Sequence, residues 1–242
     1  MLASIPVLRE LINGRISFVD SLTLICFSLY ALALALDISN LLSMDNLFSF
    51  LSPTSGSLLK LGMGGAIPLS YGHWWTLITA TYLHGSLLHI LFNILWLRQI
   101  GPLAIELFGA SRFFIIYTLA GFSGALVSAL AGTPFFVGAS GAIFGLFGAL
   151  IYYGWHRGGT FGSTIFRQML VWAAIGLIFG FMQPRVDNWG HIGGFIGGVI
   201  AAVALGYQER TRQSLGVHIG ALVSILVVVL CFALQAITFL SG

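Results

Sequence analysis

The chain has 242 residues, of which 58% are hydrophobic and only 7% are charged. Soluble domains carry about 25% charged residues, so this composition excludes an ordinary water-soluble domain and indicates a protein built to lie in lipid. The formal net charge of +3 does not indicate a nucleic-acid partner, because the ten Lys and Arg residues are scattered between apolar runs and form no basic face.

The first apolar stretch covers residues 18–36 and follows a short segment that carries Arg9 and Arg15. No small-residue cleavage site follows it, so we expect a retained membrane helix and not a signal peptide. Cys26 and Cys231 lie inside apolar runs near opposite ends of the chain. Their placement indicates neither a disulfide framework nor a redox motif.

A long connection follows, at about residues 37–83, in which Pro68 and several Gly and Ser residues interrupt the apolar pieces. We expect no regular spanning helix there. The connection ends near His73-Trp74-Trp75, and such amphipathic aromatic residues favour the membrane interface. The sequence therefore predicts a loop lying partly in the outer leaflet, with a plain external loop as the alternative.

Six further stretches approach the length of about 20 apolar residues that a spanning helix needs. They cover approximately residues 84–107, 112–131, 139–156, 165–182, 189–207 and 217–240. Together with residues 18–36, they predict an all-α membrane protein that forms one polytopic domain over residues 1–242. Its core would occupy about residues 18–207, and residues 217–240 would form an additional C-terminal transmembrane helix.

The basic residues divide unevenly between the two sides of such a bundle. Seven spans place eight of them on one side and two on the other: Arg9, Arg15, Arg98, Arg112, Arg157, Arg167, Arg210 and Arg212 against Lys60 and Arg185. Because Lys and Arg favour cytoplasmic flanks, we expect a cytoplasmic N-terminus and an external C-terminus. Short loops and the lack of a transit sequence favour a bacterial inner membrane.

Ionisable and polar groups inside membrane spans are costly, so they mark candidate functional sites. His89 and Asn93 lie in the outer half of the second span, one helical turn apart on one face. Ser140 falls at the external start of the fourth span, where free backbone N–H groups and partial positive charge suit a nucleophile that generates an oxyanion. His191 falls in the first turn of the sixth span, at the same depth.

Glycines on these two spans bear on whether the serine and the histidine meet. They repeat at intervals of three or four residues: Gly141, Gly145 and Gly148 on the fourth span, and Gly190, Gly194 and Gly198 on the sixth. Small residues at this spacing let helix backbones pack closely. If the two faces touch, an imidazole nitrogen reaches the serine hydroxyl, as a general base must. Ordinary helix packing is the alternative for the glycines alone.

Three strings resemble the motifs of the rhomboid proteases, in that family's order and at the outer ends of spans two, four and six. They are His89-Ile90-Leu91-Phe92-Asn93, similar to H-x-x-x-N; Gly138-Ala139-Ser140-Gly141, similar to G-x-S-G; and Gly190-His191-Ile192-Gly193-Gly194, similar to A-H-x-x-G with glycine in place of alanine. The resemblance extends from about Trp74 to Gly198. It implies a rhomboid-like six-helix bundle, to which the seventh helix is an addition.

The resemblance implies an intramembrane serine endopeptidase that acts on the transmembrane helices of other proteins. Ser140 would be the nucleophile and His191 the general base of a dyad, with no cofactor and no metal. His89, Asn93 and the backbone N–H of Ser140 would form the oxyanion hole. The active site would open to the external side of the membrane.

Further residues would support this site. By the same resemblance, Gly138, Gly141 and Gly194 belong to its motifs, and Phe144 would stack on the catalytic histidine where many members have tyrosine. Glu106 resembles a glutamate that hydrogen-bonds neighbouring helices, with Ser111 as its partner. This chain reads Trp74-Trp75-Thr76 where members often have Trp-Arg, which leaves the anchoring of the first external loop unexplained.

Other interpretations of single residues are weaker. His84 and His89 invite a metal site, but no H-E-x-x-H motif or nearby carboxylate completes one, and a structural role for His84 is preferred. Asp187 lies four residues before His191 and invites a triad. Its place in a short loop favours a solvated carboxylate or one paired with Arg185.

Two other classes of function stay open. A catalytically silent rhomboid-like protein would bind transmembrane helices without cutting them, but such relatives lack the serine or the histidine, and this chain keeps both. A transporter would need polar groups along a path through the bilayer. Here they cluster at the outer end, so proteolysis is the preferred function.

Overall fold

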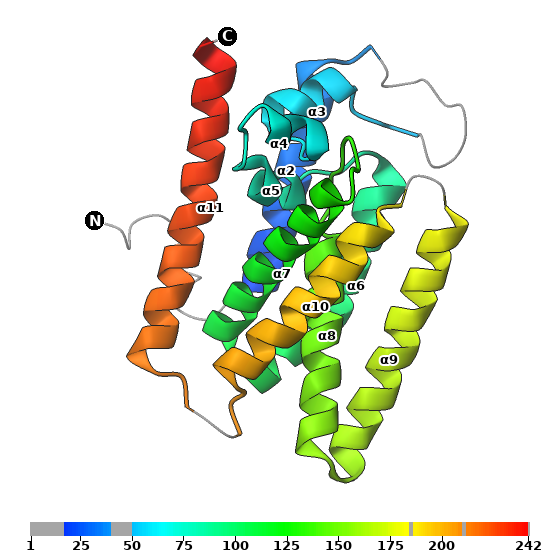
Figure 1. The fold of residues 1–242 in the computed structure, drawn as a ribbon, viewed down its shortest axis with the longest axis vertical. Helices are drawn as coiled ribbons and strands as arrows, with labels where there is room; N and C mark the ends of the chain where they lie inside the picture. Colours follow the sequence, from blue (N-terminus) through cyan, green and yellow to red (C-terminus); the bar gives the residue numbers. More distant parts are fainter. Residues whose placement is uncertain (1–16, 40–49, 184–185, 210–211, 242) are drawn as a thin grey trace.

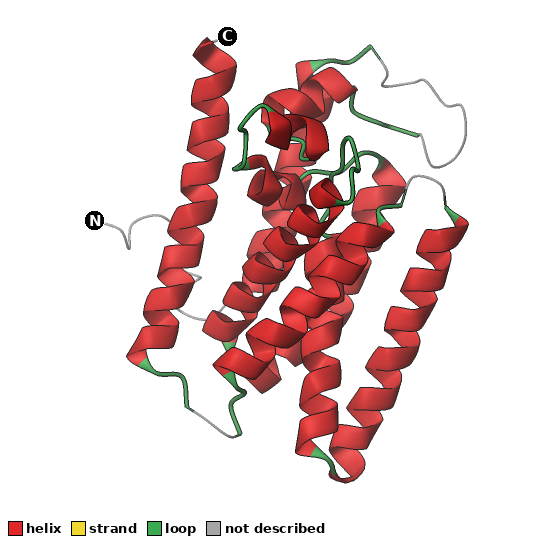
Figure 2. Ribbon diagram, in the orientation of Figure 1, coloured by secondary structure: helices red, strands yellow, loops and turns green. Residues whose placement is uncertain are grey.

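The structure, a computed structural model, describes residues 17–39, 50–183, 186–209 and 212–241 (Figure 1). Helices make up most of this part of the chain, and no β-strand is found in it (Figure 2). The one pairing of β type that it contains is an isolated antiparallel bridge between Gly64 and Phe136. The prediction of an all-α fold is confirmed.

Seven long helices of the described residues form the bundle. They are α2 (Phe18–Leu36), α6 (Leu87–Phe108), α7 (Ala110–Leu130), α8 (Ser140–Arg157), α9 (Gly159–Met182), α10 (Asn188–Leu205) and α11 (Leu215–Ser241). Their bounds agree with the predicted spans to within three residues, except that α9 begins at Gly159 and not at residue 165. Residues 159–164 are mostly Gly, Ser and Thr. Their low hydropathy kept them out of the predicted span, although they form the first turns of α9.

Six helices in the described part of the chain are long and apolar enough to cross a membrane, and α8 is the long helix not among them. It is packed against α7, α9 and α10, and two thirds of its residues are buried. A helix enclosed in this way presents few side chains to lipid, so it needs less apolar character than its neighbours.

The long connection between α2 and α6 holds only short helices: α3 (Ser55–Leu61), α4 (Ala66–Ser70), α5 (Thr76–Thr79) and the 3-10 helix η3 (Ala80–Tyr82). The expectation that no spanning helix forms there is confirmed for residues 50–83, while residues 40–49 lie outside the described part. Trp74 is half exposed and Trp75 is partly buried. The placement of this loop in the outer leaflet stays a prediction.

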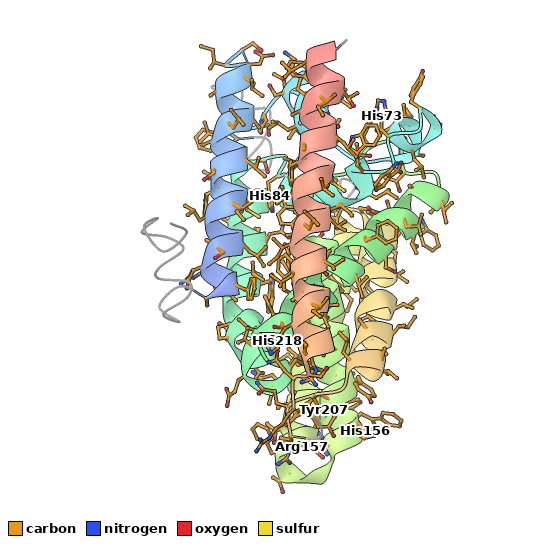
Figure 3. All side chains as sticks on the ribbon, turned by 90° about the vertical axis from the view of Figure 1, so that its left-hand side faces the viewer. His73, His84, His156, Arg157, Tyr207 and His218 are labelled. Carbon is orange, nitrogen blue, oxygen red and sulfur yellow. The ribbon has the colours of Figure 1, made fainter. Side chains whose placement is uncertain are left out.

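The two ends of the bundle collect different segments. In Figure 1, α3, α4, α5 and the C-terminal end of α11 share one end, whereas the α8–α9 and α10–α11 connections share the other. Figure 3 shows His73 and His84 towards the first end and His156, Arg157, Tyr207 and His218 towards the second. Successive connections therefore lie at alternate ends of the bundle, as the predicted topology requires. Arg9, Arg15, Arg185 and Arg210, which entered the charge argument, lie outside the described residues.

Glycines bring α8 and α10 into backbone contact. A methyl group added to Gly194 would lie 2.0 Å from the carbonyl oxygen of Gly141, and one added to Gly198 would lie 2.0 Å from that of Gly145. Helix α7 joins them, since a methyl group on Gly124 would lie 2.5 Å from the carbonyl oxygen of Gly190. The predicted glycine contact between the fourth and sixth spans is confirmed.

Arg112 links segments at the end of the bundle that holds the α10–α11 connection, and its side chain is almost completely buried. Its guanidinium donates to the carbonyl oxygens of Leu205 at 3.0 Å, Phe108 at 3.3 Å and Arg212 at 3.2 Å. The α6–α7 corner and the segment that follows α10, about 100 residues apart in sequence, are therefore joined at one side chain.

The expected pairing of Glu106 with Ser111 is wrong. The hydroxyl of Ser111 lies 2.9 Å from Nδ1 of His218 on α11, and Glu106 is exposed. The C-terminal helix supplies the partner, and the resemblance to a six-helix core gave no information about contacts with that helix.

Candidate active site

Ser140 is the first residue of α8, and the segment before it is held by the loop between α2 and α6, which the sequence predicts to be external. The N–H of Gly138 donates to the carbonyl oxygen of Ala80 at 2.9 Å, and Gly138 has a φ of +133°. This conformation, which side chains disfavour, turns the chain into the helix. Ser140 therefore meets the free N–H groups of the first helical turn, and its side chain is only partly buried.

His191 lies in the first turn of α10. The side chain of Asp187 caps this helix, because its Oδ1 accepts the N–H of Gly190 at 3.0 Å. The imidazole of His191 is buried, and its Nε2 lies 2.9 Å from Oγ of Ser140. The structure thus brings together the two side chains that the sequence placed at equal depth.

The ring of His191 is held by stacking. Phe144, one turn after Ser140, lies parallel to it, with ring centroids 4.2 Å apart and an interplanar angle of 12°. Nδ1 of His191 has no hydrogen-bond partner in the part of the chain that is described, and Asp187 is engaged in its helix cap. The geometry is that of a Ser-His pair without a third carboxylate member.

His89 presents a nitrogen to the turn before Ser140. Its Nδ1 accepts the N–H of Gly85 at 3.2 Å, so the ring proton of the neutral imidazole resides on Nε2. A methyl group added to Gly138 would lie 2.7 Å from Nε2 of His89 and 3.8 Å from Oγ of Ser140. Nε2 is therefore a donor close to the nucleophile.

Asn93 follows His89 by one turn of α6 and is buried. Its Nδ2 donates one hydrogen to the carbonyl oxygen of His89 at 2.8 Å, which fixes the orientation of the amide. A side-chain amide nitrogen carries two hydrogens, so the second remains for another acceptor.

A small recess of about 30 Å³ adjoins Ser140. Its lining includes Ala80, Thr81, Gly124, Gly138, Ser140 and Asp187. One water needs about 10–15 Å³ of such volume together with polar partners, and the hydroxyls and the carboxylate supply them. The recess has room for a water molecule beside the serine hydroxyl.

His84, for which the sequence favoured a structural role, is completely buried and packs edge-on against His89, with ring centroids 5.2 Å apart. Neither of its ring nitrogens meets a hydrogen-bond partner among the residues that the structure describes. The histidine therefore forms part of the wall behind His89.

Sequence reasoning missed Gln235. The indole N–H of Trp75 donates to its Oε1 at 2.8 Å, and its Nε2 donates to the carbonyl oxygens of Leu59 at 2.9 Å and Lys60 at 3.1 Å. The available signal was that Gln235 is the only side-chain amide in the apolar run 215–241. This contact anchors the loop between α2 and α6, which lacks the Trp-Arg pair.

A family model described as Rhomboid domain matches residues 71–208 of the chain. Rhomboid protease GluP of Bacillus subtilis (strain 168) is 39% identical over 158 residues, which are 65% of this chain and 31% of that protein. RHOMBOID-like protein 5 of Arabidopsis thaliana is 35% identical over 161 residues, 64% of this chain and 52% of the relative. RHOMBOID-like protein 1 of the same plant is 36% identical over 176 residues, which are 69% of this chain and 42% of the relative.

The chain therefore spans between about a third and a half of the length of these relatives. The matched region includes His89, Asn93, Ser140 and His191 and covers more than half of the chain. With six apolar helices in its described part, the protein is an integral multi-pass membrane protein, and it belongs to the rhomboid family.

Proposed function

We propose that the protein is an intramembrane serine endopeptidase that hydrolyses peptide bonds in or near the transmembrane helices of other membrane proteins. The observation that carries the proposal is the distance of 2.9 Å between Oγ of Ser140 and Nε2 of His191 at the starts of two adjoining helices. A relative 39% identical over 158 residues bears the name of a rhomboid protease.

The reaction begins with proton transfer from the hydroxyl of Ser140 to Nε2 of His191 as Oγ attacks the substrate carbonyl carbon. The C–N bond of the tetrahedral intermediate then breaks, and His191 returns the proton to the leaving amine. An ester on Ser140 remains. A water molecule from the adjoining recess attacks this ester, with His191 again as the base. The ester C–Oγ bond then breaks, His191 returns the proton to Oγ of Ser140, and the acid product leaves.

Three donors stabilise the negative oxygen of the intermediate. They are the backbone N–H of Ser140, Nε2–H of His89 and the second N–H of Asn93. The amino-terminal end of α8 adds partial positive charge at the same place. Loss of one such donor costs about 2.7–4 kcal/mol of transition-state stabilisation.

The substrate helix must unwind before it is cut, because its carbonyls are hidden in internal hydrogen bonds. Substrates with Gly, Ala or helix-breaking residues near their external end therefore suit this site best. We place their lateral access between α6 and α9, where two aromatic pairs, Phe92–Phe179 and Trp96–Trp172, have centroids 6.3 Å and 5.5 Å apart. The membrane that best fits the predicted topology is a bacterial inner membrane, with the site on its external face.

The test is cleavage of a single-span substrate by purified protein in liposomes. Wild-type protein should cleave it and should react at Ser140 with a fluorophosphonate. Ser140→Ala and His191→Ala should each lose at least about a thousandfold in kcat.

Cleavage by all three proteins at equal rates would refute the Ser-His mechanism. If the wild type neither cleaves nor reacts with the fluorophosphonate, the alternative of a catalytically silent rhomboid-like protein is favoured.

A further inference from the structure

Gln235 is a buried amide on α11, a helix most of whose side chains are exposed or only partly buried. Helix α11 has few buried side chains, yet Gln235 is only 7% exposed. A side-chain amide in an apolar membrane is unfavourable unless its groups are hydrogen-bonded. The three hydrogen bonds of Gln235 all go to the external loop, to the indole of Trp75 and to the carbonyl oxygens of Leu59 and Lys60.

The same loop is bonded to the segment that precedes the nucleophile. Gly64 and Phe136 exchange both of their backbone hydrogen bonds, at 3.1 Å and 2.8 Å. The carbonyl oxygen of Ala80 accepts the N–H of Gly138 at 2.9 Å. The position of residues 136–138 is therefore fixed by the loop as well as by the helices of the bundle.

The loop contacts are internally braced. The hydroxyl of Thr79 donates to the carbonyl oxygen of Gly62 at 2.7 Å, which links α5 to the end of α3. A methyl group added to Gly62 would lie 2.4 Å from that hydroxyl and 3.2 Å from Cγ of Gln235. On the same face of α11, Phe232 packs against Tyr82 with ring centroids 5.8 Å apart.

We infer that Gln235 is a positioning residue. Through Gln235, α11 clamps the external loop, and the loop in turn fixes Gly138. The position of Gly138 beside His89 determines where the backbone N–H of Ser140 lies. The catalytic part of this inference rests on the proposed function, and its structural part does not. It gives the seventh helix a role in the geometry of the site, although Gln235 touches no reacting atom.

The test substitutes Gln235→Met, which keeps the length of the side chain and removes every hydrogen bond. Hydrogen exchange should become about 3- to 20-fold faster in residues 60–66 and 134–140, the range that interhelical hydrogen bonds in membrane bundles support. Exchange in residues 105–109 and 154–158, at the other end of the bundle, should not change.

Turnover separates positioning from mere stability. Gln235→Met should lower kcat about tenfold, because misplaced donors act on the transition state, and should leave KM within about twofold. Trp75→Phe should have a similar effect. The double variant should be no slower than the slower single variant, because both changes break the hydrogen bond between Trp75 and Gln235.

Ile237→Met is the matched control, since it places the same side chain on the exposed face of α11 and should leave exchange and turnover unchanged. Unaltered exchange at 134–140 in Gln235→Met, or equal acceleration at both ends, would overturn the clamp. Faster exchange at 134–140 with unchanged kcat would overturn the positioning role. If the wild type cleaves nothing, the proposed function fails, and exchange still decides the clamp.

Discussion

At the scale of single residues, Gly138 meets two demands that only glycine satisfies. Its φ of +133° disfavours any side chain, and the space where a side chain would project is occupied by Nε2 of His89 at 2.7 Å. The absent methyl group lets a hydrogen-bond donor approach the nucleophile.

Gly138→Ala should therefore lower kcat/KM by at least about a hundredfold, because the methyl group would displace His89 from the proposed oxyanion hole. The measurement is turnover of a single-span substrate, together with the unfolding temperature. Gly132→Ala is the control, since Gly132 also has a positive φ, +86°, but has open space around it. It should cost about 1–2 kcal/mol of stability and leave turnover intact. Equal turnover in both variants would contradict the role of Gly138.

His89→Ala and Asn93→Ala should each lower kcat by about 100- to 1000-fold with little change in KM, because the proposed mechanism has these donors act on the transition state and not on the bound substrate. Steady-state kinetics over a range of substrate concentrations checks this. The control is Leu95→Ala, on the exposed face of the same helix. A rise in KM with unchanged kcat would assign the two residues to substrate binding.

At the scale of helices, the site depends on how closely α8 and α10 approach. Gly194→Ala should separate the two helices, because its methyl group would lie 2.0 Å from the backbone oxygen of Gly141. We expect a loss of about 1–3 kcal/mol in unfolding free energy and a loss of turnover as Ser140 and His191 move apart. Gly216→Ala, in a helix turn where the nearest atom is 3.6 Å away, is the control. It should be neutral or stabilising, and an equal loss there would refute the packing argument.

The spans, the glycine faces and the meeting of Ser140 with His191 were predictable, because each depends on local pattern: hydropathy over about 20 residues, spacing of about four, and depth within a span. Contacts with α11 were not. Trp75 and Gln235 are 160 residues apart in sequence, and their pairing depends on the path of an irregular loop. The pairing of Ser111 with Glu106 was wrong because its actual partner, His218, is 107 residues away in sequence, and no local pattern indicates that contact.

At the scale of the whole molecule, the uneven distribution of Lys and Arg predicts the orientation in the membrane. Lys60→Cys should react with a membrane-impermeant maleimide in intact spheroplasts, whereas Arg157→Cys should react only after permeabilisation. Lys60 belongs to α3 at the end of the bundle predicted to be external, and Arg157 lies at the opposite end (Figures 1 and 3). The wild type is the control, because both of its cysteines are buried. The reverse labelling pattern would invert the topology.

The modest hydropathy of α8 matters most during biosynthesis. Helix α8 is not among the helices of the described residues that are apolar enough to cross a membrane by themselves, so we expect it to insert stably only when α7, α9 and α10 enclose it. The histidine that would activate its serine is synthesised about fifty residues later. If the proposed mechanism is right, a nascent chain holds the serine without its base, and we expect cleavage only after α8 and α10 have come together.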